Sequence, residues 1–210
     1  MSDRLLVVFD RQHTGKPNRG PGTAMGEDRG ALLRGTAADR SEADLTPIYY
    51  TRAAEVLSAS GVGVRIIDPL TDPPRLSYGA RHERVKWWAR DAGTQVVYLA
   101  CHLNAGGGNY AVTGHDHRSS SGRAVATAIA ARLGRLAPVA RSRVEALTGS
   151  WARGAPCIQG VYDGPVHLRG VLLEPLFVDH LGHVQYIEAG GLAEVGQAIA
   201  DGLLDWWRAL

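Results

Sequence analysis

The sequence predicts a single α/β domain of three layers, in which helices flank a mostly parallel, twisted sheet. Short apolar runs that are typical of buried strands alternate with longer stretches of helical periodicity, and this order favours parallel strands joined by helices. A length of 210 residues suits one large domain, and no repeat or linker divides residues 1–210. With 45% hydrophobic and 21% charged residues, the composition excludes a disordered or fibrous protein.

Apolar runs and helix-boundary residues place the elements along the chain. The predicted strands cover residues 5–9, 62–67, 96–100, 110–113 and 171–177. A first helix begins at the capping pair Thr46-Pro47 and ends at Gly61, and further helices cover residues 78–92, 119–136 and 192–210. Residues 11–40 are rich in glycine and proline and predict a long loop of the functional or mobile kind, whereas residues 144–166 show no clear pattern.

Charge and hydropathy exclude several classes of protein. The 23 Lys and Arg residues nearly balance 21 Asp and Glu residues, and no basic block or zinc-finger spacing indicates a nucleic-acid partner. No apolar run approaches the roughly 18 residues of a membrane span, and the run at 5–9 is too short for a signal-peptide core. We therefore expect synthesis in the cytoplasm without a signal peptide. Cys101 and Cys157 are too few for a disulfide framework and are expected to be buried as small apolar residues.

Two histidines follow predicted strands at the end where ligands bind in parallel sheets. His13 comes shortly after the strand at 5–9, and His102 follows the strand at 96–100. A catalytic zinc ion needs three nitrogen, sulfur or oxygen ligands and an open position for water. Glu42, just before the first helix, is a candidate third ligand, although the spacing of these residues matches no short-range metal motif. The pattern alone therefore leaves this site open.

Glu174 interrupts the apolar strand at 171–177. A carboxylate in a buried strand is costly unless it is paired, bound to metal or catalytic. Beside a zinc-activated water it could serve as general base and then general acid. An edge strand with Glu174 facing solvent is the alternative.

Several short motifs occur in an order that resembles one enzyme family over nearly the whole chain. They are Asp10-Arg-Gln-His13-Thr-Gly15, Glu42-Ala-Asp44, Ala100-Cys-His102-Leu-Asn104-Ala105, Val171-Leu-Leu-Glu174-Pro-Leu-Phe177 and the closing helix with Ala198-Ile199. This set is similar to the zinc-dependent N-acetylmuramoyl-L-alanine amidases of the amidase-3 family. The resemblance implies one Zn²⁺ ion held by His13, Glu42 and His102, with Glu174 as the catalytic residue.

The resemblance also implies hydrolysis of the amide between N-acetylmuramic acid and L-alanine in peptidoglycan. Peptidoglycan would be the partner of this protein, which is expected to be a monomer. We expect a phage endolysin-like catalytic domain without a separate wall-binding domain, released through a holin-type pore, by lysis or by a secretion machine. Asn104, His115 and His117 are expected to bind substrate, with a solvated loop as the alternative for the two histidines. Asp10 is a candidate partner for a ligand histidine.

Four residues stand where the family pattern differs, and they put the activity level in doubt. Gln12 and Leu176 replace glycines, Pro175 follows the expected catalytic glutamate, and Cys101 precedes a ligand histidine. Three other functions stay open. These are a different zinc peptidase on the same scaffold, a non-catalytic peptidoglycan-binding module, and a cytoplasmic enzyme that acts on recycled wall fragments.

Overall fold

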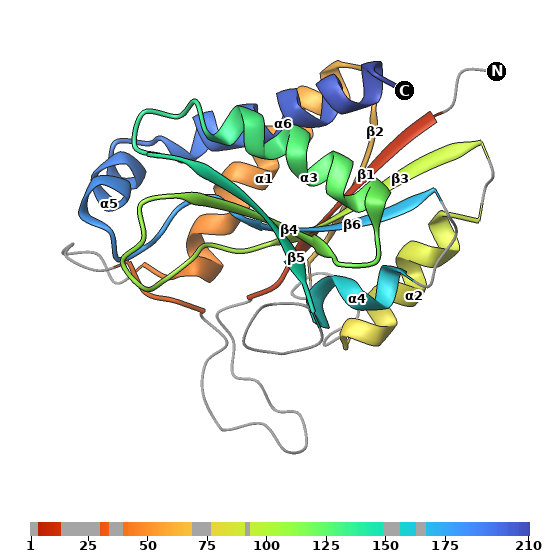
Figure 1. Cartoon of the computed structure of the whole chain (residues 1–210), viewed down its shortest axis with the longest axis horizontal. Helices are drawn as coiled ribbons and strands as arrows, with labels where there is room; N and C mark the ends of the chain where they lie inside the picture. The colour runs from red at the N-terminus through yellow and green to blue at the C-terminus, as the bar shows by residue number, and fades with distance from the viewer. Residues whose placement is uncertain are drawn as a thin grey trace.

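A six-stranded sheet in the order β2-β1-β3-β6-β4-β5 forms the middle layer of the protein (Figure 1). The computed structural model describes residues 4–13, 30–33, 40–68, 77–90, 93–148, 156–162 and 167–210. The strands are β1 (Arg4–Arg11), β2 (Gly63–Ile67), β3 (Thr94–Cys101), β4 (Ala111–Asp116), β5 (Ser142–Leu147) and β6 (Leu168–Glu174). All neighbouring pairs are parallel except β4 and β6, which are antiparallel. The predicted α/β class with a mostly parallel sheet is confirmed.

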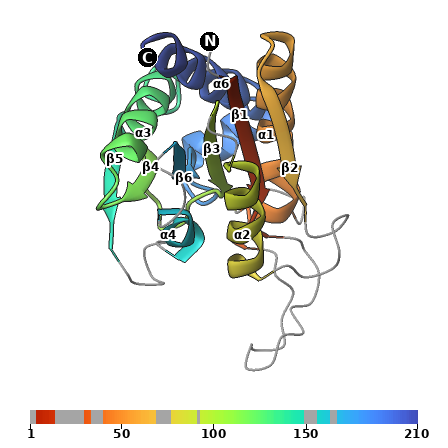
Figure 2. The same cartoon turned by 90° about the vertical axis from the view of Figure 1, so that its right-hand side faces the viewer.

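Helices cover both faces of the sheet (Figure 2). One apolar cluster joins the sheet to α1 (Glu42–Ala59), α3 (Ser120–Leu133) and α6 (Leu192–Arg208), and a second joins it to α2 (Tyr78–Trp88) and α4 (Pro156–Tyr162). A further helix, α5 (Leu181–Glu188), follows β6. None of the described helices is long and apolar enough to cross a bilayer.

The central strand β3 shows why both faces are buried. Val97, Leu99 and Cys101 enter the first cluster, whereas Val96, Tyr98 and Ala100 enter the second. Successive side chains of a strand point to opposite faces, so a continuous apolar run fits a strand with helices on both sides. The apolar run at 96–100 is therefore a core strand, as predicted.

The first helix begins five residues earlier than predicted. Ser41 is its N-cap and forms a capping box with Asp44, so Glu42 is the first helical residue instead of preceding the helix. The predicted cap, Thr46, lies buried inside the helix together with Pro47. The Pro47 nitrogen carries no hydrogen and cannot donate to the Ala43 carbonyl, four residues earlier. This carbonyl therefore needs a donor from outside the helix.

Other boundaries differ where sequence signals were weak. Strand β6 ends at Glu174, before Pro175, and does not continue to Phe177. The unpatterned stretch at 144–166 contains the end of β5 and helix α4, and His180 caps the start of α5. Most of the predicted loop at 11–40 lies outside the described residues.

Candidate metal centre

His13, Glu42 and His102 meet at one edge of the sheet. They are the only group of three or more potential ligands that the described parts of the chain bring together, and their ligand atoms all lie within 4.8 Å of one another. His13 follows β1, His102 follows the adjacent strand β3, and Glu42 begins α1. Glu42 Oε1 lies 2.9 Å from His102 Nδ1 and 3.6 Å from His13 Nε2.

The chemistry and spacing of these atoms fit a zinc ion. Zinc binds imidazole nitrogen and carboxylate oxygen at about 2.0–2.2 Å in a tetrahedron, so two ligand atoms should lie roughly 3.3–3.6 Å apart. The separation of 3.6 Å from His13 lies in this range, and the separation of 2.9 Å from His102 would lengthen by about 0.4 Å around the ion. Two imidazoles and one carboxylate also leave a fourth position for water, as catalytic zinc sites require.

Backbone groups hold the Glu42 carboxylate in place. Oε1 accepts a hydrogen bond from the Leu103 amide at 2.8 Å, and Oε2 accepts one from the Ala31 amide at 3.1 Å. Burial by itself would raise the pKa of Glu42, but the hydrogen bond with His102 and the nearby histidines keep this pKa below its ordinary value. Glu42 is therefore ionised and oriented, as a metal ligand must be.

Arg11 connects the two segments that carry His13 and Glu42. Its Nε donates to the His13 carbonyl at 3.1 Å, and its Nη2 donates at 2.9 Å to the Ala43 carbonyl that Pro47 leaves unpaired. Its Nη1 forms an ion pair with Asp68 at 3.1 Å. One planar guanidinium thus sets the distance between the end of β1 and the start of α1.

Gly30 approaches the same site more closely than any other residue type could. Its φ of +66° is left-handed, and an added Cβ would lie 2.5 Å from Glu42 Oε2 and 2.8 Å from His13 Cδ2. Such contacts are shorter than real Cβ atoms make. Glycine is required here both for backbone conformation and for space.

The two cysteines differ in their relation to His102. Cys101 belongs to the core cluster on the α1 face, where burial raises the pKa of its thiol. Cys157 is also buried, as predicted, but its sulfur lies 3.7 Å from His102 Nε2. The His102 ring is therefore held between Glu42 on one side and the Cys157 thiol on the other.

Asp10 pairs with residues other than a histidine. Its fully buried carboxylate forms an ion pair with Arg81 at 3.1 Å and accepts a hydrogen bond from the Tyr98 hydroxyl. Burial is the main cause that raises the pKa of Asp10 to about 6. Arg81 also donates to the Arg11 carbonyl at 3.3 Å, so this buried group supports the end of β1 behind the metal site. Gln12 joins the group through Tyr98.

Glu174 ends β6 beside the segment that carries His102. Cys101 pairs with Leu173, so His102 and Glu174 come next on the two neighbouring strands. Burial, followed by the charges of Glu42 and Glu145, raises the pKa of Glu174 to about 7. A carboxyl group with this pKa can both accept and donate a proton near neutral pH.

Asn104, which was predicted to bind substrate, contacts Glu174. Its Nδ2 donates to Glu174 Oε2 at 2.7 Å. The Asn104 backbone donates to the Leu176 carbonyl and accepts from the Val178 amide, so both segments hold it in place. Leu176 is fully buried in the core, which accommodates the departure noted at this position.

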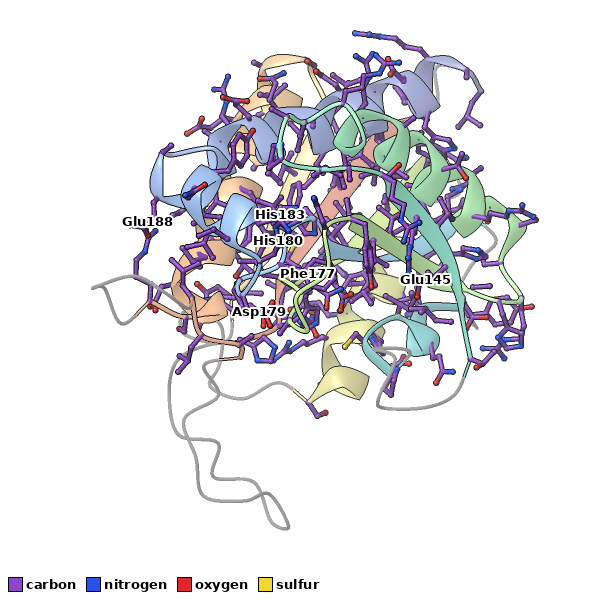
Figure 3. The ribbon with its side chains drawn as sticks, turned by 60° about the vertical axis from the view of Figure 1, so that its left-hand side comes forward. Glu145, Phe177, Asp179, His180, His183 and Glu188 are labelled. Atoms are coloured by element: carbon purple, nitrogen blue, oxygen red, sulfur yellow. The ribbon has the colours of Figure 1, made fainter. Side chains whose placement is uncertain are left out.

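The segment after β6 also supports the glycine-rich loop that follows Asn104 (Figure 3). Asp179 accepts hydrogen bonds from the Gly106 and Gly107 amides at 2.7 and 2.9 Å. The buried His183 accepts from the Phe177 amide through Nδ1, and its Nε2 lies within hydrogen-bond distance of the Pro138 carbonyl. Both side chains therefore stabilise the loops around Asn104.

His115 and His117 lie away from the metal centre. Val112 pairs with Glu174 and His115 with Val171, so β4 runs from the site toward the opposite end of the sheet. The ring of His115 lies 2.8 Å from the Asp116 carbonyl, and that of His117 lies 3.1 Å from the Leu147 carbonyl. The antiparallel direction of β4 is the reason that the structure does not bring these two predicted residues to the site.

Two histidines that follow parallel strands and a glutamate that begins α1, with the half-buried Glu174 beside them, define a candidate metal site with room for a water ligand. Comparison with solved structures identifies the fold. The chain has the fold of N-acetylmuramoyl-L-alanine amidase catalytic domains, and the matches cover nearly its full length.

Three matches illustrate the likeness. Amidase AmiC2 of Nostoc punctiforme has a TM-score of 0.69 at 19% identity, with 99% of each chain covered. Amidase Ami1 from Mycobacterium smegmatis has a TM-score of 0.70 at 12% identity, with 100% of each chain covered. The catalytic domain of the CD27L endolysin, which targets Clostridia difficile, has a TM-score of 0.62 at 16% identity, with 96% of this chain and 97% of that domain covered. No family model and no curated protein sequence matches the chain.

Proposed function

We propose that the protein is a zinc-dependent N-acetylmuramoyl-L-alanine amidase that cleaves peptidoglycan. The observation that carries this proposal is the convergence of His13, Glu42 and His102 beside Glu174 in a chain with the amidase fold. These three ligands would hold one zinc ion. When bound, zinc supplies a Lewis acid that polarises the scissile carbonyl and acidifies water.

Glu174 would perform both proton transfers. It would accept a proton from the attacking water and return it to the nitrogen of the departing L-alanine. The pKa of about 7 places the group near the operating pH, where one residue can serve in both roles. Asn104 donates to Oε2, so Oε1 would be the oxygen that exchanges the proton.

The test is digestion of purified peptidoglycan by zinc-loaded protein, with the products identified by mass spectrometry. We expect peptides with a free L-alanine amino terminus and glycan strands with intact lactyl carboxylates. Glu174→Gln should bind stoichiometric zinc and lose turnover, whereas Glu55→Gln, at an exposed residue of α1, should remain active. Cleavage within the peptide would instead identify a different zinc peptidase, and binding without cleavage or metal would identify a wall-binding module.

An endolysin role is a further part of this proposal, and the likeness to the CD27L catalytic domain supports it. When the protein is added to intact cells from outside, only cells with peptidoglycan exposed to the medium should lyse. Expression inside a bacterium should cause lysis only with a holin-type pore. Lysis without such a pore would contradict the expected route of release.

A further inference from the structure

An arginine lies in the same row of the sheet as Glu174. Val112 of β4 pairs with Glu174 on one side and with Arg143 of β5 on the other. Residues that oppose each other in neighbouring strands point to the same face of a sheet. Arg143 and Glu174 therefore project from the same face, two strands apart, and their backbones are separated by roughly 10 Å.

Aromatic contacts hold the Arg143 side chain at this position. Its guanidinium lies 3.8 Å from the centre of the Tyr110 ring. That ring contacts Phe177 edge to face at 4.8 Å, and Phe177 is buried just beyond the end of β6. The stacked guanidinium is thus oriented before any ligand binds, which lowers the entropy cost of binding.

Arg143 is half-buried and forms no ion pair with any residue that the structure describes. Arg141 lies near the same ring at 5.7 Å and adds a second positive charge. Glu145, labelled on β5 in Figure 3, comes two residues after Arg143 and forms no ion pair with a described residue either. A stacked arginine without an acidic partner presents its planar donors to a carboxylate.

We propose that Arg143 binds a carboxylate of the substrate peptide one residue beyond the scissile amide; this inference rests on the proposed amidase function. An extended peptide advances about 3.3–3.6 Å per residue, so a carboxylate on the second residue lies roughly 7 Å from the nitrogen that Glu174 protonates. The backbones of Glu174 and Arg143 lie roughly 10 Å apart across Val112, and the long arginine side chain can span the remaining difference of roughly 3 Å. Arg143 is thus a specificity-determining residue for a negatively charged second residue.

Two soluble muropeptides test this assignment. They are identical except that the α-carboxyl of the second residue is free in one and a carboxamide in the other. Zinc-loaded wild type should cleave the carboxylate form with a kcat/KM about 10- to 100-fold higher, the range expected for a hydrogen bond between charged groups. Arg143→Gln should lose this preference, and Arg143→Lys should keep part of it. The exposed Arg123→Gln of α3 is the matched control and should behave as wild type.

The outcomes separate the two proposals. Cleavage of both muropeptides at equal rates by wild type, or an unchanged preference in Arg143→Gln, would overturn the role of Arg143 and leave the amidase proposal intact. If the wild type cleaves neither, the proposed function is wrong, and calorimetric binding of the two muropeptides to wild type and Arg143→Gln then decides the carboxylate site. Thermal melts of all variants show whether a lost preference reflects lost folding. An Arg143→Gln protein that is folded and still prefers the carboxylate refutes the assignment.

Discussion

Replacing Arg11 with glutamine should weaken zinc binding without removing any ligand. The guanidinium donates to the carbonyls of His13 and Ala43, and each charge-assisted hydrogen bond contributes about 1.5–3 kcal/mol. Loss of both would cost about 3 kcal/mol at least if nothing replaced them. Because the side chain is 12% exposed, water can replace part of this interaction. We therefore expect a loss of about 1.4–2.8 kcal/mol, which is a 10- to 100-fold increase in the zinc Kd.

Competition against a chromogenic chelator at constant pH measures this Kd directly. The matched control is Arg52→Gln, which removes an exposed arginine that bonds to Gln197 far from the ligands. Thermal melts of both variants without zinc report any general loss of stability. If Arg11→Gln lowers the Tm but binds zinc as tightly as Arg52→Gln, Arg11 supports the fold and does not position the ligands.

Three further predictions follow from the contacts of the site. Asn104→Ala should lower kcat by about 10- to 100-fold at nearly constant KM and zinc content, because Glu174 loses the donor that orients it; an unchanged kcat would show that burial alone orients Glu174. Arg81→Met should lower the free energy of unfolding in urea by about 3–5 kcal/mol near pH 7.5, since it leaves the buried Asp10 carboxylate without its cation. A loss below about 1 kcal/mol would contradict this. Burial and the charge of His180 lower the pKa of His183 from 6.5 to about 4, so its protonation opposes folding, and the free energy of unfolding should fall as the pH drops from 6.5 toward 4. His183→Gln should show a weaker dependence in melts across this range, and an identical one would exclude His183 as the source.

The sequence predicted best those strands that consist of one continuous run of apolar residues, because such a run can be recognised locally. Strands β1, β3 and β6 are continuous apolar runs, and each was expected within a few residues of its observed bounds. His13 and His102 were placed at the edge where they are found, because polar residues that follow parallel strands share one end of the sheet. Glu42 was the harder ligand, since its place before a helix made it only one candidate and the family resemblance was needed to support it.

Residues that act through distant contacts could not be predicted in this way. Arg11 and Arg81 each look like ordinary surface arginines in the sequence, yet their partners lie 32 and 71 residues away. Pro47 was the one available signal for Arg11, because a proline inside a helix always leaves a carbonyl that needs another donor. Gly30 stood among many glycines in a long unpatterned stretch, with no signal to distinguish it.

By itself the sequence determined the class of fold and the kinds of side chain available for chemistry, because apolar periodicity and residue type are local properties. The tertiary structure alone decided which of those side chains meet. It turned β4 antiparallel to β6, which carried His115 and His117 away from the site and placed Arg143 in the row of Glu174. The direction and neighbours of a strand depend on pairing between segments far apart in the chain, and no short stretch of sequence records that pairing.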